Sequence, residues 1–117
     1  MKHIPWWLVV GLLLVHDNGT PYAEWMKSLV QPGRHAVSCC GEADQYWVKE
    51  YVPSHRKGVA FVAVVLTKDG KDTFMVDIPD DKVIWNQVNP TGRGVIFLAS
   101  NDGGEQNVLC FVPGTGT

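Results

Sequence analysis

The segment "VAFVAVVLTKDGKDTFMVDI", residues 59–78, constrains the fold most, because two strand-like runs flank the pair Asp69-Gly70. An Asp-Gly pair supplies the positive φ angles of a two-residue type I′ turn, so the segment predicts a β-hairpin. The first arm, Val59–Leu66, is apolar on both faces, which is typical of a central strand covered on both sides. The second arm alternates more clearly and is expected nearer to a sheet edge.

Further strand signals lie on either side of this hairpin. Residues 45–52, "QYWVKEYV", are rich in aromatic and β-branched residues, and regular alternation would place Val48 and Glu50 on one face and Tyr51 on the other. The runs 95–99 and 108–112 are separated by a glycine-rich loop and predict a second hairpin. Between the hairpins, residues 82–85 predict a short strand, and "NPTG" at 89–92 predicts a turn.

The fold class follows from the number and spacing of these elements. The run "EWMKSLVQPG", residues 24–33, has apolar residues at helical spacing and ends at Pro-Gly, so it predicts a short amphipathic helix. We expect a mainly β protein: a small antiparallel sheet or barrel of five to six strands with a short N-terminal helix. The alternative is an α+β open sheet with the helix packed on one face, and the strand order stays open.

The first 23 residues have the pattern of an export signal. Lys2 and His3 give a basic start, and residues 6–15 form an apolar core that is too short to span a bilayer. We expect cleavage after Ala23, a single small β-rich domain over residues 24–117, and a periplasmic or secreted location without a stable membrane span. An uncleaved membrane anchor is the alternative.

The chain has three cysteines, which allow one disulfide and leave one thiol. Cys110 lies in an apolar, alternating run that suits a buried bridge. Cys39 and Cys40 are adjacent, so in an extended stretch they point to opposite sides and only one of them reaches Cys110. We favour Cys40 as its partner, with Cys39 as the alternative, and expect the third thiol to be buried or paired with another chain.

A metal site would combine the three cysteines with His35. Structural zinc sites take their cysteines from positions two or more residues apart, whereas adjacent side chains diverge. We therefore expect no metal and no cofactor.

The charge pattern and the aromatic residues bear on function. A formal net charge of −2 with scattered basic residues disfavours nucleic acid as a partner. We favour a noncatalytic binding or accessory module whose partner is an envelope protein or a cell-wall fragment, because small β domains commonly bind through exposed aromatic anchors. The candidate binding residues are Glu42, Asp44, Tyr46, Trp47, Trp85, Asn86, Asn89 and Thr91.

Two alternatives stand beside this hypothesis. The aromatic side chains would simply fill the core, or Glu42, Asp44, His35 and the free cysteine would form a small enzyme or metal-dependent site. No recognisable catalytic motif supports the second alternative, so no catalytic residue is assigned.

Three segments resemble a known group of sequences. They are "SCCGEAD" followed by Tyr46-Trp47, "IWNQVNPTGRGVIFL" at 84–98, and "VLCFVPG" at 108–114. Together they resemble a group of small uncharacterised exported proteins of proteobacteria. The resemblance implies export to the periplasm or beyond, and it implies no particular activity.

Overall fold

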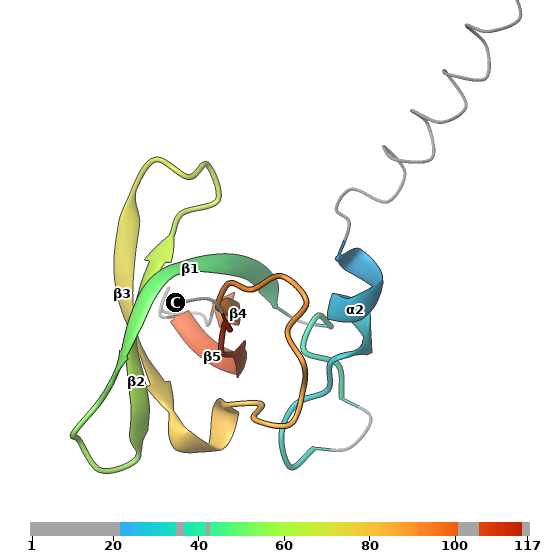
Figure 1. The fold of residues 1–117 in the computed structure, drawn as a ribbon, viewed down its shortest axis with the longest axis horizontal. Coiled ribbons are helices and arrows are strands. Elements are labelled where there is room, and N and C mark those ends of the chain that lie inside the picture. The colour runs from blue at the N-terminus through green and yellow to red at the C-terminus, as the bar shows by residue number, and fades with distance from the viewer. Residues whose placement is uncertain (1–21, 35–36, 42, 101–105, 116–117) are drawn as a thin grey trace, which may run out of the picture.

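The computed structural model describes residues 22–34, 37–41, 43–100 and 106–115. Its elements are the helix α2 (Ala23–Ser28), the strands β1 (Asp44–Pro53), β2 (Val59–Leu66) and β3 (Thr73–Pro79), the 3-10 turn η1 (Asp80–Lys82), and the strands β4 (Val95–Ser100) and β5 (Gln106–Val112). The five strands form one antiparallel sheet in the order β3-β2-β1-β4-β5. The sheet curls into a half-barrel (Figure 1), so the expected mainly β fold with a short N-terminal helix is confirmed.

The first part of the chain is described only from Tyr22 onward. The expected signal peptide therefore lies almost wholly outside the described residues and stays a prediction. Within the part that the structure describes, no helix has the length and apolar character needed to cross a membrane.

Strand β1 changes its partner along its length. Its first residues pair with β4, up to Trp47 opposite Val95, and its later residues pair with β2, from Val48 opposite Val65 onward. The register shifts between Val48 and Glu50, which marks a β-bulge at Lys49. A bulge bends and twists a strand, and here it allows one strand to join both halves of the curled sheet.

The bulge also changes which side chains of β1 face the core. Val48 and Tyr51 both pack in the cluster between the two hairpins, whereas Glu50 is exposed. The regular alternation expected over residues 45–52 is therefore wrong beyond Val48, because one extra residue reverses the faces of all that follow.

Strands β2 and β3 form the first expected hairpin, with β3 at the edge of the sheet as predicted. The turn is wider than expected. Thr67 N–H bonds to Asp72 O at 3.0 Å, and inside this pair Gly70 N–H bonds to Thr67 O at 2.8 Å. The Asp69 carboxylate accepts hydrogen bonds from Thr67 Oγ1 at 2.7 Å and Lys71 N–H at 2.9 Å, and these bonds hold the wider loop. The type I′ prediction is wrong, although Gly70 does adopt a positive φ of 74°.

The apolar character of β2 is only partly explained by burial. Ala63 and Val65 face the core and are fully buried, while Val62 and Val64 are half-buried. The prediction of a strand covered on both sides therefore holds for one face only.

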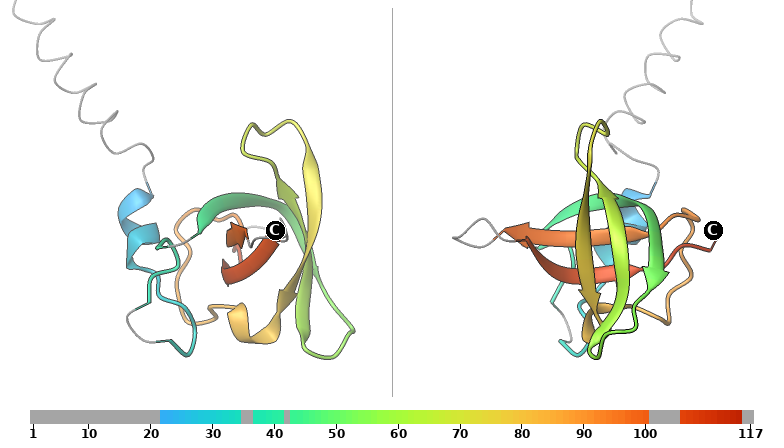
Figure 2. Two further views of the ribbon diagram at one scale, coloured as in Figure 1. Left: turned by 180° about the vertical axis from the view of Figure 1, so that it is seen from behind. Right: turned by 90° about the vertical axis from the view of Figure 1, so that its left-hand side faces the viewer.

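The hairpin of β4 and β5 lies at the centre of the molecule and is buried on both faces. It runs across the β2–β3 hairpin, as the right panel of Figure 2 shows. On one face Ile96, Leu98 and Phe111 pack against β2 and β3, and on the other face Val95, Phe97 and Val112 pack against the N-terminal segment. This second hairpin is where the sequence predicts it.

The N-terminal segment is fixed by a short antiparallel ladder. Val30 pairs with Ser38, Gln31 N–H bonds to Val37 O at 2.8 Å, and Cys39 N–H bonds to Leu29 O at 3.0 Å. In this register Leu29 and Cys39 face inward and are buried, while Val30 is 47% exposed.

The disulfide joins Cys39 to Cys110, with Cα atoms 5.8 Å apart. The bridge itself is confirmed, but the preferred partner Cys40 is wrong. The ladder directs Cys39 into the second face of β4–β5, whereas the neighbouring Cys40 lies half-buried at the edge of the same cluster, with its thiol donating to Met26 O at 3.4 Å.

The short strand expected at residues 82–85 is also wrong. Asp80–Lys82 form the 3-10 turn, and only Val83 makes an isolated parallel bridge, to Phe111. Ile84 N–H bonds to Phe111 O at 2.8 Å, so this segment follows the outer side of β5 for two residues without pairing further.

Removing the disulfide should destabilise the protein by about 4 kcal/mol, because a bridge between cysteines this far apart in sequence strongly restricts the unfolded chain. The two cysteines lie 71 positions apart. Chemical denaturation of Cys110→Ala should show this loss under nonreducing conditions. The matched variant Cys40→Ala should lose about 1 kcal/mol or less, since it removes only one weak hydrogen bond. Equal losses in the two variants would contradict the assigned pairing.

Candidate functional site

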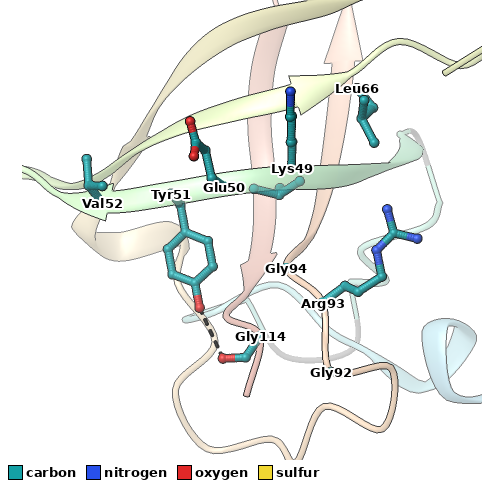
Figure 3. A pocket seen from close by; sticks show the side chains of 10 residues that line it. Lys49, Glu50, Tyr51, Val52, Leu66, Gly92, Arg93, Gly94 and Gly114 are labelled. Carbon is teal, nitrogen blue, oxygen red and sulfur yellow. Dashed lines mark hydrogen bonds between the residues drawn. The ribbon is translucent and has the colours of Figure 1, made fainter. Parts of the chain in front are cut away.

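A groove of about 470 Å³ lies beside β1, just beyond its bulge. Figure 3 shows β1 on one side of it and the turn that precedes β4, together with the chain after β5, on the other. It is lined by Val48, Lys49, Glu50, Tyr51, Val52, Leu66, Gly92, Arg93, Gly94 and Gly114. The groove has the size of a ligand site and a backbone-rich wall.

The groove exists because the chain turns away from β1 before β4 begins. The Asn89 side chain is buried, and its Nδ2 donates to Arg93 O at 2.7 Å and to Pro113 O at 3.0 Å. Its Oδ1 accepts from Thr91 N–H at 2.9 Å, and Gly92 completes the turn with a φ of 74°. The predicted turn at 89–92 is thus confirmed, and Asn89 ties it to the chain that leaves β5.

Glycine allows the far wall of the groove to pack tightly. A Cβ on Gly114 would lie 2.8 Å from the backbone of residues 92–94. This distance is too short for any side chain at position 114. Tyr51 crosses to this wall and donates from its hydroxyl to Gly114 O at 3.0 Å (Figure 3). Its ring also makes edge contacts with Phe61 and Phe111, so this wall is anchored to the core.

The later half of β1 has a strand partner on one side only. Glu50–Pro53 follow the bulge and pair with β2, and no other described strand pairs with them. The first half of β1 likewise pairs only with β4, but there Lys68 Nζ donates to Gln45 O at 2.6 Å and lies over the Tyr46 ring, which covers the free side. The free side of the later half borders the groove instead.

The Arg93 side chain lies at the end of the groove near β4. Its guanidinium lies 4.3 Å from the centre of the Trp47 ring, while Lys49 and Glu50 line the groove from the other side of β1 (Figure 3). Among the described residues, the one ion pair is Arg56–Asp77, far along β3, so Arg93 has no carboxylate partner there. Its donors are held in place by the stacked ring and are directed by a rigid turn.

The expected binding residues do not form a single surface. Tyr46 packs with the cluster between the hairpins and Trp47 with the cluster on the far side of β4–β5, so these two neighbours face opposite ways. Asp44 and Asn86 are exposed, Thr91 is half-buried in the turn, and Asn89 is a buried structural residue. Glu42 lies outside the described residues.

Trp85 occupies a separate open hollow. Its side chain is 66% exposed and its ring lies 5.7 Å from that of Phe61. The hollow also contains Arg56, whose charge is already paired with Asp77.

The groove residues themselves lie outside the expected set. Lys49, Tyr51, Val52 and Arg93 come together only because of the bulge and the turn, and neither the pairing of β1 nor its bulge is marked by a local motif. In the sequence, the repeated glycines of "TGRG" and "VPGTG" are the one indication that these two backbone segments pack closely against each other.

The alternative enzymatic or metal-dependent site gains no support from geometry. His35 and Glu42 lie outside the described residues, and burial raises the pKa of the Cys40 thiol, which keeps it protonated and weakly nucleophilic. Within the described ranges, no three His, Cys, Asp or Glu side chains converge as metal ligands.

Comparisons with protein-family models, with curated proteins and with solved structures found no match to this chain. The resemblance to small exported proteobacterial proteins therefore stays a prediction.

Replacing Asn89 with Ala should destabilise the protein by about 2 to 3 kcal/mol, because it leaves buried backbone carbonyls without donors. The exposed neighbour Asn86 provides the control, and Asn86→Ala should leave the free energy of unfolding unchanged within about 0.5 kcal/mol. Chemical denaturation of both variants measures this difference. A neutral Asn89→Ala would show that the turn is held by other contacts.

Proposed function

We propose that this protein is an exported, noncatalytic binding module that holds an extended peptide segment of a partner protein in the groove beside β1. The peptide adds a strand to the free side of the later half of β1. The observation that carries the proposal is that this strand half pairs with β2 alone and borders the groove with its other side.

Strand addition suits the chemistry of the groove. An unpaired strand edge presents backbone donors and acceptors in a row, and an extended peptide satisfies them with its own backbone. The opposite wall contains Gly92, Gly94 and Gly114, which carry no side chains, so backbone atoms line this side of the groove. Val52, which is 57% exposed, and Leu66 offer apolar contacts for alternate peptide side chains.

Hydrogen bonds connect the walls of the groove in the absence of a ligand. Tyr51 is bonded to Gly114, and Asn89 holds the turn against the chain after β5. A preorganised groove lowers the entropic cost of binding, which matters for a peptide that must itself become ordered.

Export to the periplasm or the cell exterior is the second part of the proposal. The Cys39–Cys110 bridge supports it, because disulfides persist mainly in oxidising compartments. The signal pattern of residues 1–23 supports it independently. The partner is accordingly expected among envelope proteins that expose an extended segment.

Peptide selection followed by NMR tests the groove. Random octapeptides are displayed in two libraries, one with the peptide inside a fusion and one with it at a free C-terminus, and enriched sequences are synthesised. Binding to the ¹⁵N-labelled, disulfide-intact protein should shift the backbone amides of residues 49–52, Gly92 and Gly94. Shifts confined to the surroundings of Trp85, or no enrichment from either library, would contradict the proposal.

Peptides with N-methylated backbones provide a matched control for strand pairing. In a strand, successive N–H groups point to opposite sides, so N-methylation of alternate residues gives two complementary peptides. One of them should lose binding and the other should retain it. Equal binding of both would show that the peptide does not pair with β1.

A further inference from the structure

We propose that the groove recognises the free C-terminus of its peptide, with Arg93 binding the terminal carboxylate. This inference rests on the proposed function, since it assigns a direction and an end to the peptide that the groove holds.

The start of β4 closes one end of the groove. Val95 pairs with Trp47, and Val48 N–H is already bonded to Gly94 O at 3.0 Å. The side of β1 that is free beyond the bulge is therefore occupied by the protein itself up to Val48. A peptide strand in the groove cannot continue past this point.

The direction of the peptide decides which of its ends lies there. A strand added antiparallel to β1 runs in the same direction as β4, because β4 is itself antiparallel to β1. Its C-terminus then meets the turn at Arg93 and Gly94. A parallel peptide would instead bring its N-terminus to the same place.

The charge at this end favours the C-terminus. Arg93 extends from the turn toward β1 in Figure 3, whereas Lys49 and Glu50, which also line the groove, point together to the opposite side of β1. A terminal ammonium group would be repelled by the Arg93 guanidinium, whereas a terminal carboxylate would pair with it, because its forked donors match two carboxylate oxygens. Stacking on Trp47 fixes the guanidinium before binding, so little side-chain entropy is lost.

Four forms of one selected peptide test this inference. The free acid should bind at least tenfold more tightly than the C-terminal amide, as expected for loss of a charge-assisted hydrogen bond. Adding three residues to the C-terminus should weaken binding at least as much, because β4 blocks their path. Adding three residues to the N-terminus should leave the affinity within about twofold. Isothermal titration calorimetry measures all four constants.

Variants of the protein identify the residue responsible. Arg93→Gln should abolish the preference for the acid over the amide, and Arg93→Lys should retain only part of it, because lysine keeps the charge but lacks the fork. The substitutions leave Arg93 O in place for Asn89, so the turn should persist, and matching melting temperatures would verify this. Lys71→Gln, which removes an exposed cation in the β2–β3 loop, should preserve the preference.

The outcomes separate this inference from the proposed function. Equal affinity for acid and amide, together with loss of binding in one N-methylated peptide, would overturn C-terminal recognition while leaving strand addition intact. Loss of the preference in Lys71→Gln as well as Arg93→Gln would overturn the role of Arg93, since it would indicate attraction to overall charge. An acid preference that disappears only in the Arg93 variants is the result that we expect.

Discussion

The β4–β5 hairpin is buried on both of its faces, and the rest of the structure depends on covering them. Its two sets of alternating side chains require two separate packing partners. The β2–β3 hairpin covers one face as the sheet curls, whereas the N-terminal segment is too short to cover the other face without being tied to it. The Cys39–Cys110 bridge links the segment covalently to β5, within the cluster on the face of β4–β5 that the N-terminal segment covers. A domain this small gains more from such a bridge than from any further side chain it could bury.

Curling the sheet has a geometric consequence in β1. One strand must serve two hairpins that cross each other, and the bulge at Lys49 is where it passes from one to the other. Each half of β1 therefore keeps a free side. The free side of the first half is covered by Lys68. The free side of the later half borders the groove, because Asn89 holds the turn at 89–92 away from β1. The feature that allows the half-barrel to form is thus the same feature that leaves one side of β1 free, and on this side we propose that a peptide strand binds.

Local patterns predict the elements of this protein better than they predict its site. The two hairpins, the turn at 89–92 and the N-terminal helix follow from runs of residues that are adjacent in sequence. The choice between Cys39 and Cys40 depends on the ladder between Val30 and Ser38. No local motif predicts the register of this ladder. The bulge at Lys49 depends on how β1 meets two different strands, and a single extra residue reverses the side chains that follow.

The predicted binding residues do not share one surface, and the physical reason is the same. Tyr46 and Trp47 look like a pair in sequence, but adjacent residues of a strand face opposite ways, and each joins a different cluster. Asn89 was open to prediction as a turn residue, yet its burial depends on contacts with Pro113, which is distant in the chain. The groove combines residues from four separate segments of the chain, and only the fold brings them together.

Amide hydrogen exchange in β1 of the unliganded protein would show whether the later half of this strand has one free side. The amide of Val48, which is bonded to Gly94 O, should exchange slowly. Beyond it, amides of residues 49–52 that face β2 should also exchange slowly, while those that face the groove should exchange as quickly as the exposed amides of the β2–β3 loop. Slow exchange at all of these positions would show that both sides of the strand are occupied, and would contradict the account.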